Sequence, residues 1–379
     1  MTNHEAVLEA LRGVMDPELG LNVVELGMIP EVTIEGSHAI ISLALTIAAC
    51  PMRTQIEGDV RRRTLSLPGI DTIEIRTSVM GRDQRAQLMQ RARKNARDRA
   101  QETKVAPTTR VIAIASGKGG VGKSTLTANL AVAMTALGFS VGVLDADIWG
   151  FSIPRALGAT GRIQASEDKL LIPISAHGVQ VISTGLITES EETALMWRGL
   201  MLSKALEQFL TQVDWGELDY LLIDMPPGTG DVQMALSRLL PQAEMLVVTT
   251  PQVAAQKVAI RVADMARRSF MPILGAVENM SDFICDHGET YAVFGSGGGD
   301  QLAADLDIPL LGRVPLDPAV VEGQDNGRPV VAYHPKNPAS IAITALSGEI
   351  VRVLPPADAE SCVGRLAQIF DELSEVTNP

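Results

Sequence analysis

The sequence predicts an α/β fold in which a doubly wound, mostly parallel sheet is preceded by a small α+β domain. After Thr109, short continuous apolar runs such as Val111–Ala115 and Tyr220–Ile223 alternate with longer helical stretches. This pattern is typical of parallel strands that are buried on both faces. Before residue 81, β-branched segments joined by a tight turn indicate a separate, smaller sheet. The length of 379 residues also favours more than one domain.

The first domain is expected to span residues 1–80. A hairpin turn is predicted at Glu35-Gly36, because β-branched residues dominate both flanking segments. The predicted elements are a helix at Glu5–Met15, strands at Glu31–Ile34 and Ser37–Thr46, a helix at Pro51–Leu67 and a strand at Thr72–Thr77.

Residues 81–109 differ from both flanks, because arginine and lysine are concentrated there. A nucleic-acid contact is one hypothesis. Asp98 and Glu102 interrupt the basic run, however, and a solvated helical linker is the favoured interpretation. The net charge of the whole chain is −13, which argues against nucleic acid as the main ligand.

The remaining residues, 110–379, form the expected larger domain. Strands that alternate with helices in this way predict parallel pairing with helices on both faces of the sheet. The predicted elements are strands at Val111–Ala115, Ser140–Leu144, Tyr220–Ile223, Met245–Thr249 and Ile273–Val277, and a helix at Ser124–Leu137.

Cysteine usage and the N-terminus indicate the compartment. Cys50, Cys285 and Cys362 are far apart and odd in number, which does not suit a disulfide framework. Met1–Arg12 lacks the basic segment of a secretory signal, and the longest apolar run, Ala39–Cys50, is too short to cross a bilayer. We therefore expect a soluble, cytoplasmic protein with no membrane partner.

Residues Gly117–Thr125 fit the P-loop template, in which a glycine and four further residues precede Gly-Lys-Ser between a strand and a helix. Glycines let backbone N–H groups turn toward phosphate oxygens, and the helix N-terminus attracts the same anions. We expect Lys123 to neutralise the β- and γ-phosphates of ATP and the Ser124 hydroxyl to bind Mg²⁺. The other predicted nucleotide contacts are Gly117, Gly119, Gly120, Val121, Gly122 and Thr125.

Two further predicted strands end in aspartates. Asp145-Ala-Asp147 follows the second strand of the larger domain, and Asp224 closes the run Leu221-Leu222-Ile223. An acidic residue at the carboxyl end of a parallel strand points into the ligand crevice, so Asp224 is a candidate Mg²⁺ ligand. Each aspartate alone is equally compatible with a helix cap. Pro226–Asp231 is predicted to be a loop that senses the γ-phosphate.

Lys118 is a second lysine within the P-loop and is not part of the general template. Its position resembles the deviant Walker A motif of the MinD/ParA/nitrogenase-iron-protein class. The resemblance implies an ATPase that forms an ATP-dependent homodimer, in which Lys118 reaches the partner's nucleotide. It also implies that Asp147 orients the attacking water. The candidate catalytic residues are then Lys118, Lys123, Asp147 and Asp224.

Several longer motifs narrow the resemblance to the Mrp/ApbC family. They are Asp145-Ala-Asp-Ile-Trp-Gly150, Trp197-Arg-Gly199, Asp224-Met-Pro-Pro-Gly-Thr-Gly-Asp231, Glu278-Asn-Met-Ser281 and Phe294-Gly-Ser-Gly-Gly-Gly299. Members are carrier or scaffold ATPases for iron–sulfur clusters, so the resemblance implies apo iron–sulfur proteins and cluster-assembly proteins as partners. It also implies that Asn279 contacts adenine and that the stretch around Pro315 closes over the base.

The N-terminal domain shows its own resemblance. Asp16-Pro-Glu-Leu-Gly20, Val24-Glu-Leu-Gly27 and Thr46–Pro51 are similar to the small iron–sulfur-assembly-associated domain that precedes such ATPases. Cys50 matches the reactive cysteine of that domain, so the resemblance makes it a candidate cluster ligand. Its place ahead of a predicted helix favours the thiolate, whereas residue type alone fits a buried structural cysteine equally well.

Cluster ligation departs from the Mrp/ApbC pattern. The family usually carries a C-x-x-C pair after Glu-Asn-Met-Ser, and this chain retains Cys285 but has Gly288 at the second position. A dimer would then offer two thiolates there in place of the four that a bridging cluster uses. Three hypotheses remain: His287 or an external thiol completes the site, Cys50 completes it, or no cluster binds at this place. Cys362 has no assigned role.

Two alternative functions remain open. A positioning or partitioning ATPase like MinD or ParA shares the deviant P-loop and would act on membrane or DNA. The amphipathic tail Val363–Val376 carries Asp371, Glu372 and Glu375, however, and acidic lipids would repel that face. A metabolic ATPase or kinase of the same fold is the other alternative, although no added substrate motif is visible.

Overall fold

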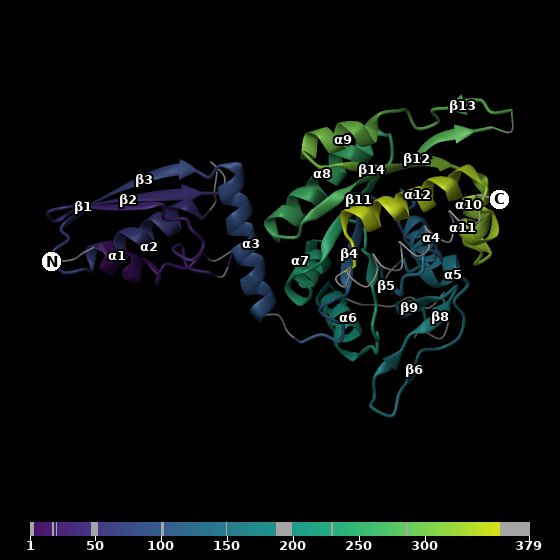
Figure 1. The fold of residues 1–379 in the computed structure, drawn as a ribbon, viewed down its shortest axis with the longest axis horizontal. Coiled ribbons are helices and arrows are strands. Elements are labelled where there is room, and N and C mark those ends of the chain that lie inside the picture. The colour runs from purple at the N-terminus through teal and green to yellow at the C-terminus, as the bar shows by residue number, and fades with distance from the viewer. Residues whose placement is uncertain are drawn as a thin grey trace, which may run out of the picture. The chain divides into compact units, whose positions relative to one another are not determined.

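Two large sheets organise the described chain, one in each of the units that residues 1–99 and 100–379 form (Figure 1). The computed structural model describes residues 4–16, 19, 21–46, 52–99, 102–148, 150–186, 199–228, 230–285 and 287–356. Cys50, Trp197, Thr229, Cys362 and the tail Val363–Val376 lie outside the described residues. Each unit has a hydrophobic core of its own.

The N-terminal unit packs helices against one face of a three-stranded sheet of the order β1-β2-β3. The side chains of β2 explain this one-sided packing, because Ala39, Ile41 and Leu43 are buried on the face toward the helices while the residues between them are half-buried. Gly36 has a φ of +63° in the turn that joins β1 to β2. The elements are α1 (His4–Leu11), β1 (Glu31–Glu35), β2 (His38–Leu45), α2 (Arg53–Leu65), β3 (Thr72–Val79) and α3 (Arg82–Arg99).

Helix α3 occupies much of the basic segment 81–109 that the sequence predicts to be a helical linker. Leu88 and Ala92 of this helix are buried in the core of the N-terminal unit. Arg91 also donates a hydrogen bond to the carbonyl of Glu25 at 3.2 Å. The helix therefore packs as part of the first unit through the few apolar residues among its charges.

The larger unit is built on a nine-stranded sheet of the order β13-β12-β11-β4-β10-β5-β9-β8, with β14 beside β12. All neighbouring pairs are parallel except those that β13 and β8 make. The strands are β4 (Arg110–Ser116), β5 (Val141–Asp145), β8 (Ile174–Ala176), β9 (Val179–Ser183), β10 (Tyr220–Asp224), β11 (Glu244–Thr249), β12 (Ile273–Ile284), β13 (Thr290–Tyr291) and β14 (Leu310–Leu316), and β6 (Gln164–Ala165) and β7 (Leu171–Ile172) form a separate hairpin.

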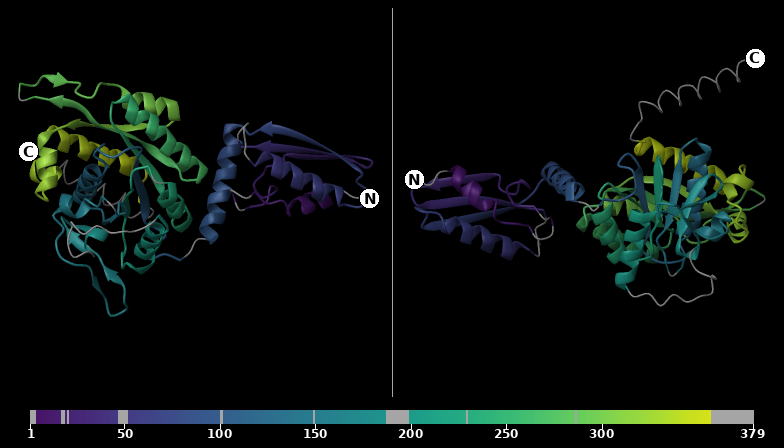
Figure 2. Two further views of the ribbon diagram at one scale, coloured as in Figure 1. Left: turned by 180° about the vertical axis from the view of Figure 1, so that it is seen from behind. Right: turned by 90° about the horizontal axis from the view of Figure 1, so that it is seen from below.

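Helices cover both faces of this sheet (Figure 2). One face packs against α6 (Gly199–Gln212), α7 (Gly230–Leu239), α8 (Val253–Arg268) and α9 (Gly298–Leu306). The other packs against α4 (Lys123–Ala136), α5 (Ile153–Leu157), α11 (Val330–Tyr333) and α12 (Pro338–Val353), with α10 (Pro318–Asp325) beside α5 and α11. Side chains alternate along each strand, so Ala113 of β4 belongs to one core and Ile112 and Ile114 to the other.

The predicted fold class, a doubly wound and mostly parallel sheet preceded by a small α+β domain, is confirmed. Strand β12 is longer than the predicted Ile273–Val277. Polar residues interrupt its apolar run from Glu278 onward, while the backbone continues to pair with β14 and then β13. Strands β8, β9 and β14 are not predicted, because their sequences are short or mixed in polarity.

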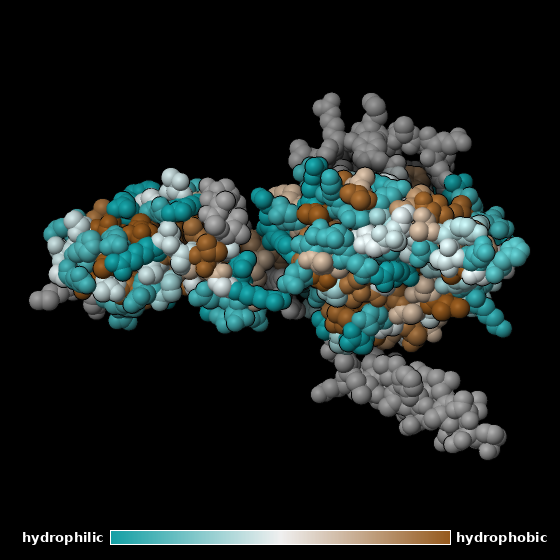
Figure 3. Space-filling view, turned by 90° about the horizontal axis from the view of Figure 1, so that it is seen from above, coloured by the Kyte–Doolittle hydropathy of each residue, from teal (hydrophilic) through white to brown (hydrophobic). Residues whose placement is uncertain are grey.

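No helix in the described part of the chain is long and apolar enough to cross a membrane. On the face that Figure 3 shows, hydrophobic and hydrophilic residues are interspersed over both units. The exposed large hydrophobic side chains include Met234 on α7 and Val253 at the start of α8. Scattered residues of this kind are ordinary on a folded protein.

The carboxyl ends of β5, β10 and β4 lie next to one another, because β10 pairs in parallel with both of the others. Asp145 at the end of β5 is in register with Asp224 at the end of β10, and β4 leads directly into Gly117. Ligands of open α/β sheets bind in the crevice outside such strand ends. The fold therefore brings the P-loop and the two aspartate-ended strands to one place.

Candidate functional site

The segment between β4 and α4 folds as a tight, glycine-dependent loop. Gly120 and Gly122 have φ angles of +78° and +77°, in the left-handed region that glycine adopts without strain. A side chain at Gly117 would place its Cβ 2.4 Å from the carbonyl carbon of Val258, so only glycine lets the loop pass α8 this closely. A loop of this geometry that runs directly into a helix N-terminus suits a phosphate group.

Lys123, Ser124 and Asp224 form one hydrogen-bonded group at the start of α4. The ammonium of Lys123 lies 2.6 Å from Asp224 Oδ1, and the Ser124 hydroxyl donates to Asp224 Oδ2 at 2.6 Å. Thr127 Oγ1 lies 3.2 Å from the same Oδ1. Lys123 is 7% exposed and Asp224 is 0% exposed. Buried charges require partners, so Lys123 and Asp224 form a buried ion pair. The hydroxyl groups of Ser124 and Thr127 bond to the same carboxylate.

Asp145 holds the loop after β5 together. Its Oδ2 accepts hydrogen bonds from the Ser183 hydroxyl at 3.1 Å and from the backbone N–H groups of Ser152 and Ile153 at 3.2 and 3.3 Å. Complete burial and the nearby Asp224 carboxylate raise the pKa of Asp145 to about 8, although the charge of Lys123 acts in the opposite direction. The Asp145 carboxyl group therefore links the loop to the neighbouring strand ends.

Asp147, two residues further on, is half-buried and lies in the loop that Asp145 organises. Its backbone N–H donates to Asp145 Oδ1 at 3.2 Å, and its own Oδ1 accepts from the backbone N–H of Gly150 at 3.1 Å. The carboxylate that the resemblance assigns to orienting water is thus fixed on the backbone of the same loop.

Lys118 contacts its own chain. Its ammonium donates to Gln252 Oε1 at 2.8 Å, and Gln252 is the N-cap residue of α8. The side chain is half-buried, so it is held at the surface of the P-loop beside the start of that helix. The resemblance implies that Lys118 reaches a partner's nucleotide, and the ammonium would then give up its hydrogen bond to Gln252.

Asn279 and Pro315 lie beside the opposite end of the P-loop. They line a cavity of about 130 Å³ together with Gly122 and Thr125. Asn279 Nδ2 donates to the carbonyl of Val121 at 2.8 Å, so the side chain is bonded directly to the loop. The structure therefore gathers the residues that the resemblance assigns to the adenine base around one enclosed space.

Cys285 follows the last residue of β12 in a tight turn. Its backbone N–H donates to the carbonyl of Glu289 at 3.0 Å, and its carbonyl accepts from the N–H of Gly288 at 2.8 Å. Gly288 has a φ of +81°. Within the described ranges, no group of three or more His, Cys, Asp or Glu side chains could hold a metal ion. Cys285 and His287 therefore belong to no such group of three among the residues that the structure describes.

Several residues of the site have no signal in the sequence that would single them out. Thr127 looks like an ordinary helical residue, and Gln252 and Gln324 lie far from the P-loop along the chain. Gln324 of α10 nevertheless accepts a hydrogen bond from the hydroxyl of Thr125. For Asp145 a signal exists, because it ends a buried strand as Asp224 does.

Two families match the chain, one in each unit. Residues 107–351 match the ParA family, described as NUBPL iron-transfer P-loop NTPase. Residues 4–76 match a family described as iron–sulfur cluster assembly protein.

Curated relatives are similar along most of the chain. The iron–sulfur cluster carrier protein of Mycobacterium leprae is 47% identical over 337 residues, which cover 86% of this chain and 87% of the relative. The iron–sulfur cluster carrier protein of Deinococcus radiodurans is 42% identical and covers 93% of this chain and 97% of the relative.

Solved structures match the larger unit. The nucleotide-binding protein of Archaeoglobus fulgidus in complex with ADP is 35% identical with a TM-score of 0.52, covering 66% of this chain and 94% of that one. The septum site-determining protein MinD of Pyrococcus horikoshii, complexed with Mg-ADP, is 25% identical with a TM-score of 0.50, covering 66% and 98%. A P-loop NTPase fold is therefore common to all of them.

Proposed function

The chain belongs to the ParA family of NUBPL-type iron-transfer P-loop NTPases, and we propose that it is an ATP-hydrolysing carrier that passes iron–sulfur clusters to apoproteins. The observation that carries the proposal is the buried group of Lys123, Ser124 and Asp224 in a chain that matches iron–sulfur families in both units. A MinD-like positioning role is less well supported. Relatives named iron–sulfur cluster carrier are 41% to 47% identical over most of the chain, whereas the MinD relative is 25% identical over 66% of it.

ATP is the proposed nucleotide. Lys123 and the backbone of the P-loop would hold its phosphates, and Asn279 and Pro315 would enclose its base. Mg²⁺, when bound, would be held by the Ser124 hydroxyl and the Asp224 carboxylate and would supply positive charge at the phosphates. The two oxygens are 2.6 Å apart, and oxygen donors of this kind are those that Mg²⁺ prefers.

Hydrolysis is proposed to require two rearrangements of lysines. Lys123 would exchange its ion pair with Asp224 for the phosphate oxygens. The Lys123 ammonium is already buried, so binding the phosphates would not require it to lose further water. Lys118 would leave Gln252 and reach the nucleotide of a second copy, which makes the active state a homodimer. Asp147 would orient the attacking water from its fixed position in the loop after β5.

The cluster is the cargo, and Cys285 is the proposed thiolate that holds it. One cysteine at this place gives two thiolates in a homodimer, so further ligands would come from His287, from Cys50 or from an external thiol. The proposed partners are cluster-assembly proteins as donors and apo iron–sulfur proteins as acceptors. The proposed compartment is the cytoplasm, where thiols stay reduced.

Anaerobic reconstitution with iron and sulfide tests the proposal. Visible absorption and iron content per chain are measured for the wild type, Cys285→Ala and Cys50→Ala, and transfer to an apo-acceptor is followed with and without ATP. We expect a cluster in the wild type, its loss in Cys285→Ala and ATP-dependent transfer. Loss in Cys50→Ala as well would add that cysteine to the ligands. A wild type that never delivers a cluster to any apo-acceptor would overturn the proposed function.

A further inference from the structure

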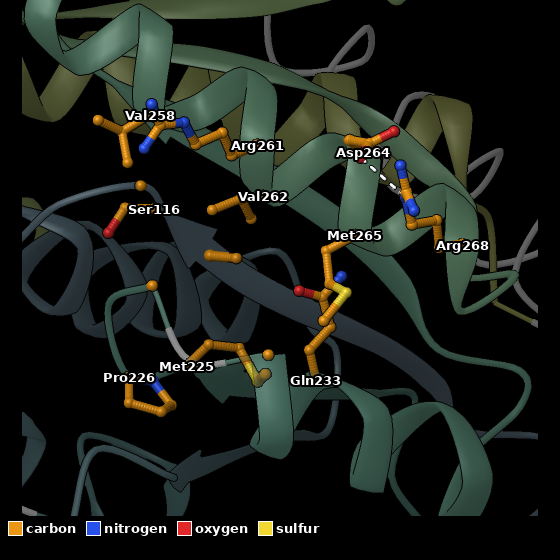
Figure 4. A pocket seen from close by; sticks show the side chains of 14 residues that line it. Ser116, Met225, Pro226, Gln233, Val258, Arg261, Val262, Asp264, Met265 and Arg268 are labelled. Carbon is orange, nitrogen blue, oxygen red and sulfur yellow. Dashed lines mark hydrogen bonds and ion pairs between the residues drawn. The ribbon is translucent and has the colours of Figure 1, made fainter. Parts of the chain in front are cut away.

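A second cavity lies beside the start of the P-loop, and Gly117 is the only predicted nucleotide contact among its lining residues. It has a volume of about 530 Å³ and opens between α7 and α8 (Figure 4). Figure 4 shows Val258, Val262 and Met265 projecting from α8 on one side, with Met225 and Pro226 on the other. The lining is therefore mainly apolar, and its volume is that of an ordinary binding pocket.

One buried amide that lines this cavity has an N–H group without a hydrogen-bond partner in the described part of the chain. Gln233 of α7 is 4% exposed, and its Nε2 atom makes no hydrogen bond among the described residues. Figure 4 places Gln233 beside the thioether of Met265, which also lies against Gly230. A buried amide without a hydrogen bond costs on the order of 1–3 kcal/mol. An occupant that displaces the flexible Met265 side chain would give Gln233 an acceptor.

The rim of the cavity is basic in a unit that is otherwise acidic. Residues 1–99 contain 13 of the 32 Lys and Arg and 13 of the 45 Asp and Glu, so the whole net charge of −13 falls on residues 100–379. Helix α8 nevertheless presents Arg261 and Arg268 at the cavity. Asp264 is hydrogen-bonded to Arg268 at 2.9 Å, whereas Arg261 makes no ion pair with any described residue. An acidic occupant is therefore favoured.

The C-terminal segment of the sequence is acidic and has regularly spaced apolar residues. Residues 357–379 carry five acidic residues and Arg365, and they place Leu366, Phe370 and Leu373 at helical spacing. Such a segment offers one apolar side and a net negative charge. Both properties complement the cavity between α7 and α8.

The position at which this tail begins allows it to reach the cavity. The carbonyls of Leu354 and Pro355 accept hydrogen bonds from the Tyr220 hydroxyl at 2.8 Å and from Arg110 Nε at 2.7 Å. Tyr220 and Arg110 are the first residues of β10 and β4, whose opposite ends border the cavity. The strands span about 20 Å, whereas the residues that follow Pro356 reach about 35 Å even if all of them are helical.

We propose that the acidic, amphipathic tail at residues 357–379 docks in the α7–α8 cavity of its own chain. Its apolar side chains would cover Met225, Val262 and Met265, and its carboxylates would pair with Arg261 at the rim. Gly117 and Gly228 also line the cavity, so the docked tail contacts both the P-loop and the loop after Asp224. The proposal rests on the cavity and the tail, not on the cluster-carrying function.

Thiol labelling tests the docking. In a chain whose native cysteines are replaced by serine, Met265→Cys serves as the reporter, and the rate of its reaction with a maleimide is measured. The full chain is compared with the same chain ending at Pro356, which keeps the Leu354 and Pro355 contacts. We expect labelling at least about five-fold slower in the full chain, which corresponds to about 80% docked tail. Val253→Cys, 62% exposed and outside the cavity lining, should label equally in both chains.

Point variants test whether protection of the Met265→Cys reporter from labelling depends on the apolar side chains of the tail. Leu366→Ser with Phe370→Ser in the full chain should label as fast as the shortened chain, and added salt should weaken the protection. A peptide of residues 357–379 added to the shortened chain should restore it. Equal labelling rates in the full and shortened chains would overturn the proposal. Protection that rises with protein concentration would overturn it too, because the tail would then come from a second copy.

Discussion

The ammonium of Lys123 donates to the carboxylate of Asp224 across 2.6 Å in the interior of the larger unit. The two residues come from the first turn of α4 and the last position of β10, which the parallel sheet brings together. Removal of either partner would leave the other as a buried, uncompensated charge. The pair therefore ties the stability of the unit to the residues proposed to bind phosphate and Mg²⁺.

Lys123→Met is expected to weaken ATP binding by at least about 100-fold, because it removes the charge that faces the phosphates. It should also lower the free energy of unfolding by about 3–5 kcal/mol, because Asp224 is left unpaired. Isothermal titration calorimetry and urea denaturation check the two effects.

The double variant Lys123→Met with Asp224→Asn should recover stability but not ATP binding. Wild-type ATP binding in Lys123→Met would disprove the phosphate role. Lys257→Ala, at an exposed position of α8, is the matched control.

Asp224→Asn is expected to weaken the Mg²⁺ dependence of nucleotide binding. The amide is a poorer ligand than the carboxylate, so the Mg²⁺ concentration at half-saturation should rise about ten-fold or more. Nucleotide affinity measured against Mg²⁺ concentration checks this. Asp264→Asn, which alters an exposed carboxylate on α8, should leave the curve unchanged. An unchanged curve for Asp224→Asn would exclude that carboxylate as a Mg²⁺ ligand.

Lys118→Ala is expected to leave ATP binding within about three-fold of the wild type and to lower the hydrolysis rate by about ten-fold or more. Gln252→Ala is the informative companion, because it removes the partner within the chain but keeps the ammonium. It should retain hydrolysis. Steady-state phosphate release and equilibrium ATP binding distinguish the two variants. Equal loss of hydrolysis in both would mean that Lys118 acts through its contact with Gln252 and not across a dimer.

Asp145 is expected to make stability depend on pH. Burial and the Asp224 carboxylate raise its folded pKa to about 8 from 3.8, so the folded chain holds a proton that the unfolded chain has lost within this window. Stability should therefore fall as pH rises from about 4 to 8, by at most about 1.4 kcal/mol per pH unit from this group. Urea denaturation at pH 6 and 8 measures the slope. Asp145→Asn should flatten it, and a slope equal to that of the wild type would rule out Asp145 as the titrating group.

Much of the fold is readable in the sequence because parallel strands buried on both faces must be continuously apolar. Val111–Ala115 and Tyr220–Ile223 have this property and are strands in the structure. The second half of β12 does not have it, because Glu278 and Asn279 serve other contacts there. Helix α3 was predictable as a helix, but its packing into the first unit depends on Leu88 and Ala92 among many charges.

The P-loop and the aspartates that end β5 and β10 can be read in the sequence by itself, because each depends on local spacing and polarity. Only the tertiary structure decided that Lys123 pairs with Asp224, since 101 positions separate the two residues and parallel pairing of β4 with β10 joins them. The tertiary structure likewise decides that Lys118 donates a hydrogen bond to Gln252 and that a cavity opens between α7 and α8. Contacts between distant segments follow from how strands cross over in the sheet, and no local pattern encodes them.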